Sequence, residues 1–130
     1  MTKESAAPRP TDAELAILAV LWNRGPSTVR EVHDTLSSER NTGYTTVLKT
    51  LQIMTDKGLV TREDTARAHV YQATPSQEQA QRSLLGDLMN RAFGGSAQKL
   101  IMQALATHKT SPEELAEIRK MLDEMEGRTK

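Results

Sequence analysis

Apolar residues recur every three or four positions in three stretches near the start of the chain, which is the spacing of one buried face of an α-helix. These stretches cover about residues 11–24, 28–36 and 44–57. Thr11, followed three residues later by Glu14, forms a capping-box pattern at the start of the first stretch, and a glycine follows the first and the third. The pattern therefore predicts three short amphipathic helices, with Ser27 or Thr28 as the cap of the second.

The apolar spacing changes after the third predicted helix. Residues 59–63 and 68–73 alternate as two short strands do, around a turn near residues 64–66. In the second strand the odd-numbered residues are predicted to face one side of the hairpin and the even-numbered residues the other. The turn contains no glycine, so its geometry stays open. Three helices followed by a hairpin is the order of a winged helix-turn-helix.

Three further amphipathic segments follow Pro75, with serine caps predicted at Ser76, Ser96 and Ser111. Alone, these helices would expose apolar patches large enough to predict a partner, and a second copy of the chain is the simplest one. The alternative is that they fold back onto the N-terminal part. The residues predicted to form the dimer interface are Leu84, Leu88, Leu100, Ile101, Leu105, Leu115, Ile118 and Leu122.

These elements predict a mainly α fold with a small β-hairpin, a winged helix-turn-helix followed by a C-terminal helical dimerisation region. We expect a flexible N-terminal arm over residues 1–10, a winged-helix DNA-binding domain over 11–74 and the helical dimerisation region over 75–130. The arm is polar and lacks the apolar core of a signal peptide, and no apolar run in the chain is long enough to span a membrane. A cytoplasmic protein without membrane insertion is the expectation.

Composition narrows the chemistry available to the chain. Its 130 residues include no cysteine, which excludes disulfides, thiolate metal sites and cysteine nucleophiles and fits a reducing compartment. The three histidines lie far apart, and the sequence has neither a nucleophile elbow nor a glycine-rich phosphate loop. We therefore predict no enzymatic activity, no cofactor and no metal site.

The formal net charge of zero is unusual for a nucleic-acid-binding protein, so the prediction of DNA binding rests on architecture. In a helix-turn-helix the recognition helix enters the major groove, and arginines beside the wing turn suit phosphate contacts. Threonine side chains offer hydroxyl groups for phosphates or bases and methyl groups for thymine. The predicted DNA-binding residues are Thr28, Arg30, Thr42, Tyr44, Thr45, Thr46, Lys49, Thr50, Arg62 and Arg67.

A series of short segments carries a more specific signal. In order they are Trp22 with Gly25 and Pro26, and then residues 28–32, 44–47, 57–60 and 68–71. Over about residues 11–125 the chain resembles the penicillinase-repressor family of the BlaI, MecI and CopY type. The resemblance implies that the N-terminal winged helix binds double-stranded operator DNA and that the C-terminal helices form a homodimer. Half-sites of a palindrome would then lie about one helical turn (~34 Å), or a multiple of it, apart.

The chain departs from this family in two places. Copper-responsive members carry a cysteine cluster near the C-terminus, and the absence of cysteine excludes copper sensing of that kind. In antibiotic-responsive members a membrane sensor triggers proteolysis at an Asn-Phe pair, and the corresponding stretch, about residues 102–104, lacks that pair. The resemblance to the family implies relief of repression through a sensor and protease pathway. Because the Asn-Phe pair is absent, the inducing signal stays open.

The leading hypothesis is a homodimeric transcriptional repressor. A second hypothesis is a helical protein-interaction module that docks a protein partner through its winged helix, and the zero net charge motivates it. Salt dependence separates the two, because phosphate contacts make DNA affinity fall steeply with salt. Two other classes, a small hydrolytic or metal enzyme and a regulator with a small molecule in its dimer interface, lack a supporting constellation or polar pocket in the sequence.

Overall fold

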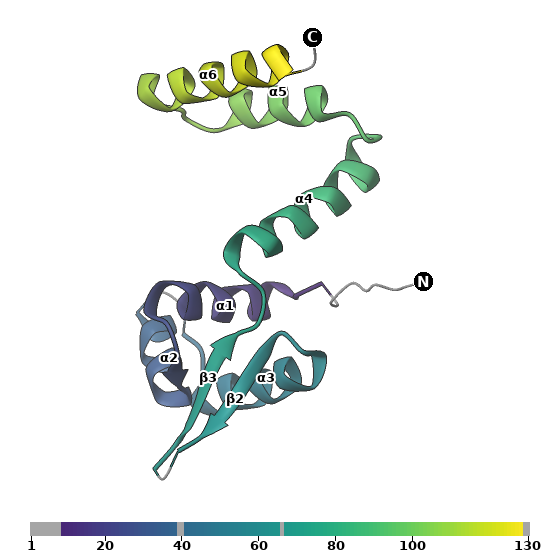
Figure 1. Cartoon of the computed structure of the whole chain (residues 1–130). Coiled ribbons are helices and arrows are strands. Elements are labelled where there is room, and N and C mark those ends of the chain that lie inside the picture. The colour runs from purple at the N-terminus through teal and green to yellow at the C-terminus, as the bar shows by residue number, and fades with distance from the viewer. Residues whose placement is uncertain (1–8, 39–40, 66, 129–130) are drawn as a thin grey trace. The chain divides into compact units, whose positions relative to one another are not determined.

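The computed structural model describes residues 9–38, 41–65 and 67–128 (Figure 1). The chain divides into two compact units, residues 1–85 and 86–130. Apart from Arg9 and Pro10, the predicted flexible arm lies outside the described residues. The predicted boundary between a DNA-binding domain and a dimerisation region, at residues 74 and 75, stays a prediction.

The first unit contains the predicted helices and hairpin and one strand that the sequence pattern did not reveal. Its elements are α1 (Asp12–Arg24), β1 (Ser27–Thr28), α2 (Val29–Ser37), α3 (Tyr44–Lys57), β2 (Val60–Asp64) and β3 (His69–Ala73). The sheet order is β1-β3-β2, and both pairings are antiparallel. In Figure 1 β2 and β3 extend as a hairpin from the helical body, and we call this hairpin with its turn, residues 60–73, the wing. The mainly helical fold with a small sheet is confirmed.

Helix boundaries follow the predicted capping chemistry. Thr11 caps α1 and Thr28 caps α2, and in each case a glutamate three residues later completes the capping box. Thr28 is thus the cap of the second helix, whereas Ser27 pairs with Tyr71 in the sheet. Gly58 ends α3 in the left-handed conformation with φ 82°, which favours glycine. Side-chain caps therefore set the starts of α1 and α2, and a left-handed glycine sets the end of α3.

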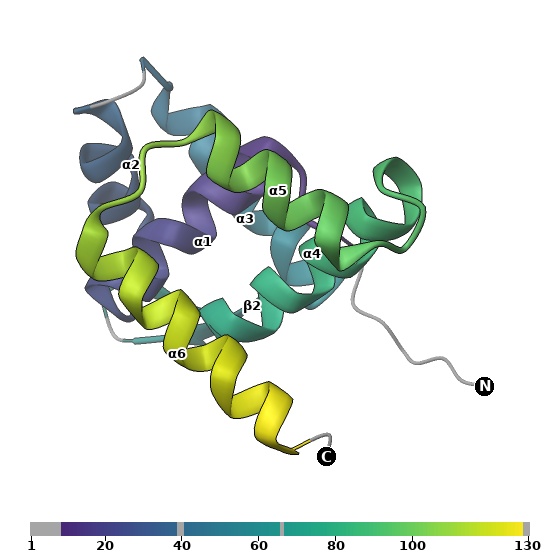
Figure 2. The same ribbon diagram turned by 90° about the horizontal axis from the view of Figure 1, so that it is seen from above.

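The core of the first unit is mainly aliphatic. Figures 1 and 2 show α1, α2 and α3 against one another, with α3 beside β2. Tyr71 in β3 is 1% exposed, so the odd-numbered side of that strand points into the core at this position. The other fully buried side chains include Leu18, Val32, Val47, Leu51, Met54, Leu59 and Val60.

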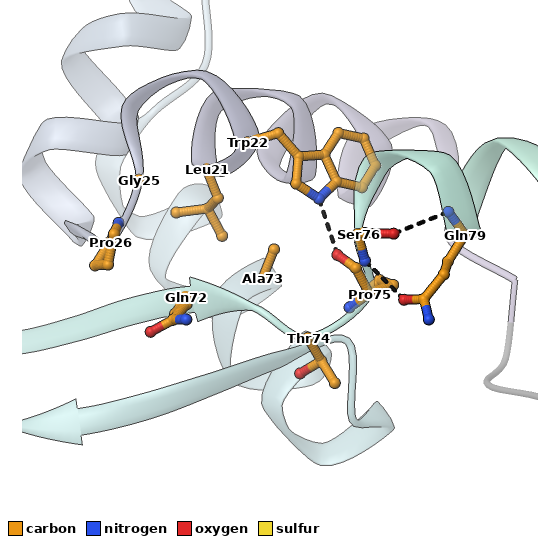
Figure 3. A pocket seen from close by; sticks show the side chains of 10 residues that line it. All are labelled: Leu21, Trp22, Gly25, Pro26, Gln72, Ala73, Thr74, Pro75, Ser76 and Gln79. Atoms are coloured by element: carbon orange, nitrogen blue, oxygen red, sulfur yellow. Dashed lines mark hydrogen bonds between the residues drawn. The ribbon is translucent and has the colours of Figure 1, made fainter.

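A hydrogen bond joins α1 to the chain that follows the wing. The indole Nε1 of Trp22 donates to the carbonyl oxygen of Pro75 at 3.0 Å, beside a pocket of about 410 Å³ (Figure 3). The amide N–H of Ser76 and the side chain of Gln79 complete a capping box at the start of α4, as predicted. Ala80, one turn further on, is buried. The first turns of α4 (Gln77–Ala92) therefore belong to the first unit.

An ion pair between a buried glutamate of α1 and a half-buried lysine of α3 links these two helices. Glu14 is 3% exposed, and both of its carboxylate oxygens accept hydrogen bonds from the Lys57 ammonium at 2.9 Å. The backbone N–H of Thr11 donates to the same carboxylate at 2.9 Å. Burial alone raises the pKa of Glu14, but the Thr11 N–H and the Lys57 ammonium more than offset it, so the pKa lies below its ordinary value of 4.5.

Lys57→Met should lower the free energy of unfolding at neutral pH by about 2 kcal/mol, because it leaves a buried carboxylate without its cation. A carboxyl group with a lowered folded-state pKa stabilises the fold above its unfolded pKa and loses that contribution as pH falls. The difference between parent and variant should therefore shrink below about pH 4.5. Urea unfolding across pH measures it, with exposed Lys49→Met as the control. A difference that persists unchanged in acid would contradict the ion-pair account.

The second unit contains the end of α4, then α5 (Ala97–Thr107) and α6 (Pro112–Arg128). Ser96 and Ser111 cap α5 and α6 as predicted, and Gly94 and Gly95 end α4 with positive φ. No residue of α5 or α6 is buried. We call the exposed apolar residues of this unit the C-terminal apolar face: Leu88, Ile101, Met102, Leu105, Leu115, Met121, Leu122 and Met125.

The predicted interface residues are exposed or half-buried in the single chain. Leu88, Ile101, Leu105, Leu115 and Leu122 are among the exposed large apolar residues. Leu84, Leu100 and Ile118 are half-buried. Within the part of the chain that the structure describes, no helix is both long enough and apolar enough to cross a membrane.

Candidate nucleic-acid interface

The side of α3 that faces away from the core carries the most distinctive chemistry of the first unit. Val47, Leu51 and Met54 are buried, so the opposite side of the helix is left to solvent. Thr45 and Lys49 lie one turn apart on that exposed side. Among the described residues the Lys49 ammonium has no ion-pair partner. This face therefore presents an uncommitted cation and a hydroxyl group.

Two further residues extend this face and were not among the predicted contacts. Gln52 is exposed three positions after Lys49, and Ile53 is 47% exposed four positions after it. Residues three and four positions apart lie on the same side of a helix, so the spacing from Lys49 could have predicted both. An amide and an exposed aliphatic side chain suit a base edge and a thymine methyl group, respectively.

The predicted contact Thr50 lies at the border of this face. Its side chain is half-buried, and its hydroxyl donates to the carbonyl oxygen of Thr46 at 2.8 Å. Thr42, Thr46 and Thr50 line a pocket of about 380 Å³ together with residues of α1 and α2. A step of about 100° per residue turns Thr50 from the exposed side of α3 toward α1.

The N-terminus of α3 is built differently from those of α1 and α2. Its N-cap is Gly43, which provides no side-chain hydrogen bond to the first turn. The Arg30 guanidinium lies 5.4 Å from the ring centre of Tyr44, and the ring of His33 packs edge-on against that tyrosine at 5.8 Å. A helix N-terminus with N–H groups not used by a cap attracts anions, and a guanidinium beside it strengthens the attraction. These features bring Arg30 and Tyr44 together at one end of α3.

Thr28 has a structural role in addition to the predicted contact with DNA. Its hydroxyl oxygen accepts a hydrogen bond from the backbone N–H of Glu31 at 3.2 Å, while its own N–H donates to the Glu31 carboxylate. The guanidinium of Arg24 lies 3.5 Å from the same carboxylate. An exchange of Thr28 for a residue without a hydroxyl group would therefore disturb the start of α2, whatever its effect on the predicted contact with DNA.

The turn of the wing is closed by a threonine in place of a glycine. The N–H of Thr65 donates to the carbonyl oxygen of Ala68 at 2.9 Å, and the hydroxyl oxygen of Thr65 accepts from the N–H of Ala68 at 3.0 Å. Ala66, part of the predicted turn, lies outside the described residues. Arg67 is exposed at this turn, and its guanidinium has no ion-pair partner among the described residues.

The second wing arginine is held by a neighbouring carboxylate. Arg62 Nε lies 3.0 Å from Asp64 Oδ1, and the same oxygen lies 2.7 Å from His69 Nδ1. Arg62 was a predicted contact, whereas Asp64 and His69 were not. Among the described residues no group of three histidine, cysteine or acidic side chains is placed to hold a metal ion.

Three helices, a wing after the third and an exposed polar face on that third helix define a winged helix-turn-helix protein, the fold class of many DNA-binding regulators. Comparison with known proteins makes the assignment specific. The chain belongs to the penicillinase repressor family, whose model matches residues 10–124. The resemblance expected from the ordered segments is thereby confirmed.

Named relatives agree with this assignment. A transcriptional regulator BlaI from Mycobacterium tuberculosis is 33% identical over 118 residues, which cover 89% of this chain and 84% of the relative. The penicillinase repressor of Bacillus licheniformis is 24% identical over 123 residues, with 95% and 96% covered. The monomeric form of BlaI from Bacillus licheniformis, solved in complex with the blaP half-operator, matches 57% of this chain and 90% of its own at a TM-score of 0.51 and 24% identity. That likeness supports the winged-helix fold.

Proposed function

We propose that this chain is a homodimeric transcriptional repressor that binds a palindromic operator. The proposal rests on the exposed side of α3 that carries Thr45 and Lys49. Arg30 lies at the N-terminus of the same helix, and the wing adds two further arginines. Membership of a repressor family supports it. The proposal places the protein in the cytoplasm, where the DNA is, and assigns it no catalytic role.

In the proposed complex α3 enters the major groove. Lys49 donates to the acceptor atoms of guanine, and Thr45 contacts a base or a phosphate. The first-turn N–H groups of α3 and the Arg30 guanidinium bind a phosphate at the edge of the groove, which fixes the orientation of the helix. Arg67 contacts the flanking backbone from the tip of the wing.

A second copy of the chain is the proposed partner of the C-terminal apolar face. Eight large apolar side chains of this face are exposed in the single chain, and burying them removes apolar area from water. Most soluble homo-oligomers are twofold symmetric, and a twofold dimer presents two copies of α3 to the two halves of a palindrome. Relief of repression by a sensor and protease would need a cleavage sequence other than Asn-Phe in α5, since residues 102–104 lack that pair.

A second candidate function is docking of a protein partner through the winged helix. The zero net charge favours it, as does the pairing of Arg62 with Asp64, which leaves fewer uncommitted cations. Measuring retention of duplex DNA as a function of salt distinguishes the two. For B-DNA the logarithm of the binding constant falls with the logarithm of salt concentration by about 0.9 per phosphate contact, whereas a protein interface has no such requirement.

Arg67→Ala should weaken binding to operator and to random-sequence duplex by similar factors and reduce the salt slope by about 0.9, because a phosphate contact carries no sequence information. Titrations of both duplexes at several salt concentrations measure this. Arg119→Ala, which removes an equal charge from the exposed surface of α6, should leave the slope unchanged. A loss confined to one sequence would show that Arg67 reads bases.

A further inference from the structure

Two side chains of α2 contact the ring of Tyr44, the first residue of α3. The guanidinium carbon of Arg30 lies over that ring, 5.4 Å from its centre, which is within the range of a cation–π contact. His33 follows Arg30 by three positions, on the same side of α2. Its imidazole packs edge-on against Tyr44, with 5.8 Å between the ring centres and 65° between their planes. The Tyr44 ring thus joins a cation and an imidazole of α2 to the start of α3.

The imidazole of His33 is itself held by hydrogen bonds on both of its nitrogens. Nδ1 donates to Asp34 Oδ1 at 3.1 Å, because an ionised carboxylate only accepts. Nε2 shares a hydrogen bond with the hydroxyl group of Ser37 at 3.2 Å. The side chain of His33 is half-buried. These contacts fix the plane of the imidazole and therefore the edge that meets Tyr44.

The bond to His33 also engages an acidic side chain that could otherwise neutralise Arg30. Asp34 follows Arg30 by four positions, the spacing at which opposite charges pair on a helix. Its carboxylate is bonded to His33, and Glu31, the other acid of α2, lies 3.5 Å from Arg24. Among the described residues the exposed Arg30 guanidinium has no ion-pair partner. This cation is therefore available to an anion from outside the chain.

We propose that Tyr44 and His33 are positioning residues for DNA binding. The aromatic face of Tyr44 supports the Arg30 guanidinium, and His33 holds the Tyr44 ring in place. The inference rests on the proposed function, in which Arg30 binds a phosphate beside the N-terminus of α3. It assigns the role of Tyr44 to its ring, whereas a direct contact with DNA would be made by its hydroxyl group.

A supported guanidinium binds a phosphate with a smaller loss of side-chain freedom. Immobilising a long, exposed side chain on binding weakens affinity, and a contact that already orders this side chain in the free protein reduces that loss. A guanidinium can lie against an aromatic ring and still donate its N–H groups to phosphate oxygens. An exposed cation–π contact changes an equilibrium constant by about two- to fivefold, so the ring should contribute up to that factor to DNA affinity.

The experiment measures dissociation constants of the full chain for two probes, the duplex that the parent retains most strongly and a random duplex of equal length. Arg30→Ala should weaken binding to both by about tenfold, because a phosphate contact carries no sequence information. Arg119→Ala, which removes an equal charge from the exposed surface of α6, is the control and should bind as the parent does. Unchanged affinity of Arg30→Ala, in a parent that binds DNA, would overturn the inference together with the Arg30 phosphate contact.

Two exchanges at Tyr44 separate its ring from its hydroxyl group. Tyr44→Leu removes both and should weaken binding to both duplexes by about two- to fivefold. Tyr44→Phe keeps the ring and should restore the parental affinity. Tyr44 is exposed, so both variants should fold, which urea unfolding checks. Equal losses in the two variants would overturn the inference and assign the contact with DNA to the hydroxyl group.

A double-mutant cycle tests whether the two positioning residues act through Arg30. Tyr44→Leu and His33→Leu should each weaken binding in the parent and have little effect in an Arg30→Ala background. Additive losses would overturn the inference, while a parent that still binds DNA would leave the proposed function standing. A parent that retains neither duplex at any salt would contradict the proposed function, and the inference would fail with it.

Discussion

Lys49→Ala is expected to lower affinity for the operator by roughly ten- to a hundredfold at physiological salt, because a good contact to a base edge contributes about 1–3 kcal/mol of discrimination. Lys49 lies at the centre of the exposed side of α3 and has no ion-pair partner among the described residues. The loss should be much smaller on random-sequence duplex, where only the phosphate attraction is removed. Competition binding with both duplexes measures the ratio of the two affinities.

Lys109→Ala is the matched control for this variant. It removes the same side chain from an exposed position between α5 and α6 and should leave the affinity ratio unchanged. Unchanged operator affinity for Lys49→Ala would show that a different face of the first unit reads the operator. An equal loss on both duplexes would reassign Lys49 to a phosphate.

Leu122→Asp should convert the proposed dimer to a monomer and raise its dissociation constant by at least about a hundredfold, since a carboxylate inside an apolar interface is costly to desolvate. Leu122 is 53% exposed in the single chain and lies on the C-terminal apolar face. Binding to a full palindrome should then fall toward the affinity for a half-site. Sedimentation of the free protein and titration of both DNAs report the two effects.

Ala116→Asp provides the control on the same helix. The residue is exposed, and at about 100° per residue it lies on the side of α6 away from Leu115, Ile118 and Leu122. This variant adds the same charge and should sediment as the parent does. A Leu122→Asp protein that remains dimeric would place the interface elsewhere than on α6.

Secondary structure in this chain could be predicted because local chemistry and tertiary packing agree. Capping residues and glycine C-caps stand where the apolar spacing begins and ends, so α1, α2 and α3 form where the pattern predicts. β1 escaped prediction because two residues are too few to show alternation, and it forms only through pairing with Val70 and Tyr71. Partners from elsewhere in the chain, not local propensity, make that strand.

The candidate site was predictable to the extent that helix geometry controls it. The exposed positions of Thr45 and Lys49 follow from the buried positions of Val47 and Leu51. The cluster around Asp64 could not be predicted, since it depends on strand register, and a turn without glycine leaves the register undetermined. The hydroxyl of Thr50 forms a bond within its own helix, which spacing alone does not reveal.

The most direct test of the central claim is selection of DNA by the purified full chain. Fragments of the genome that encodes it are incubated with the protein at physiological salt, and the retained fragments are sequenced. We predict enrichment of one palindrome with half-sites about one helical turn, or a multiple of it, apart. Retention without any enriched sequence, by a protein that sediments as an intact dimer, would contradict sequence-specific repression and favour docking of a protein partner.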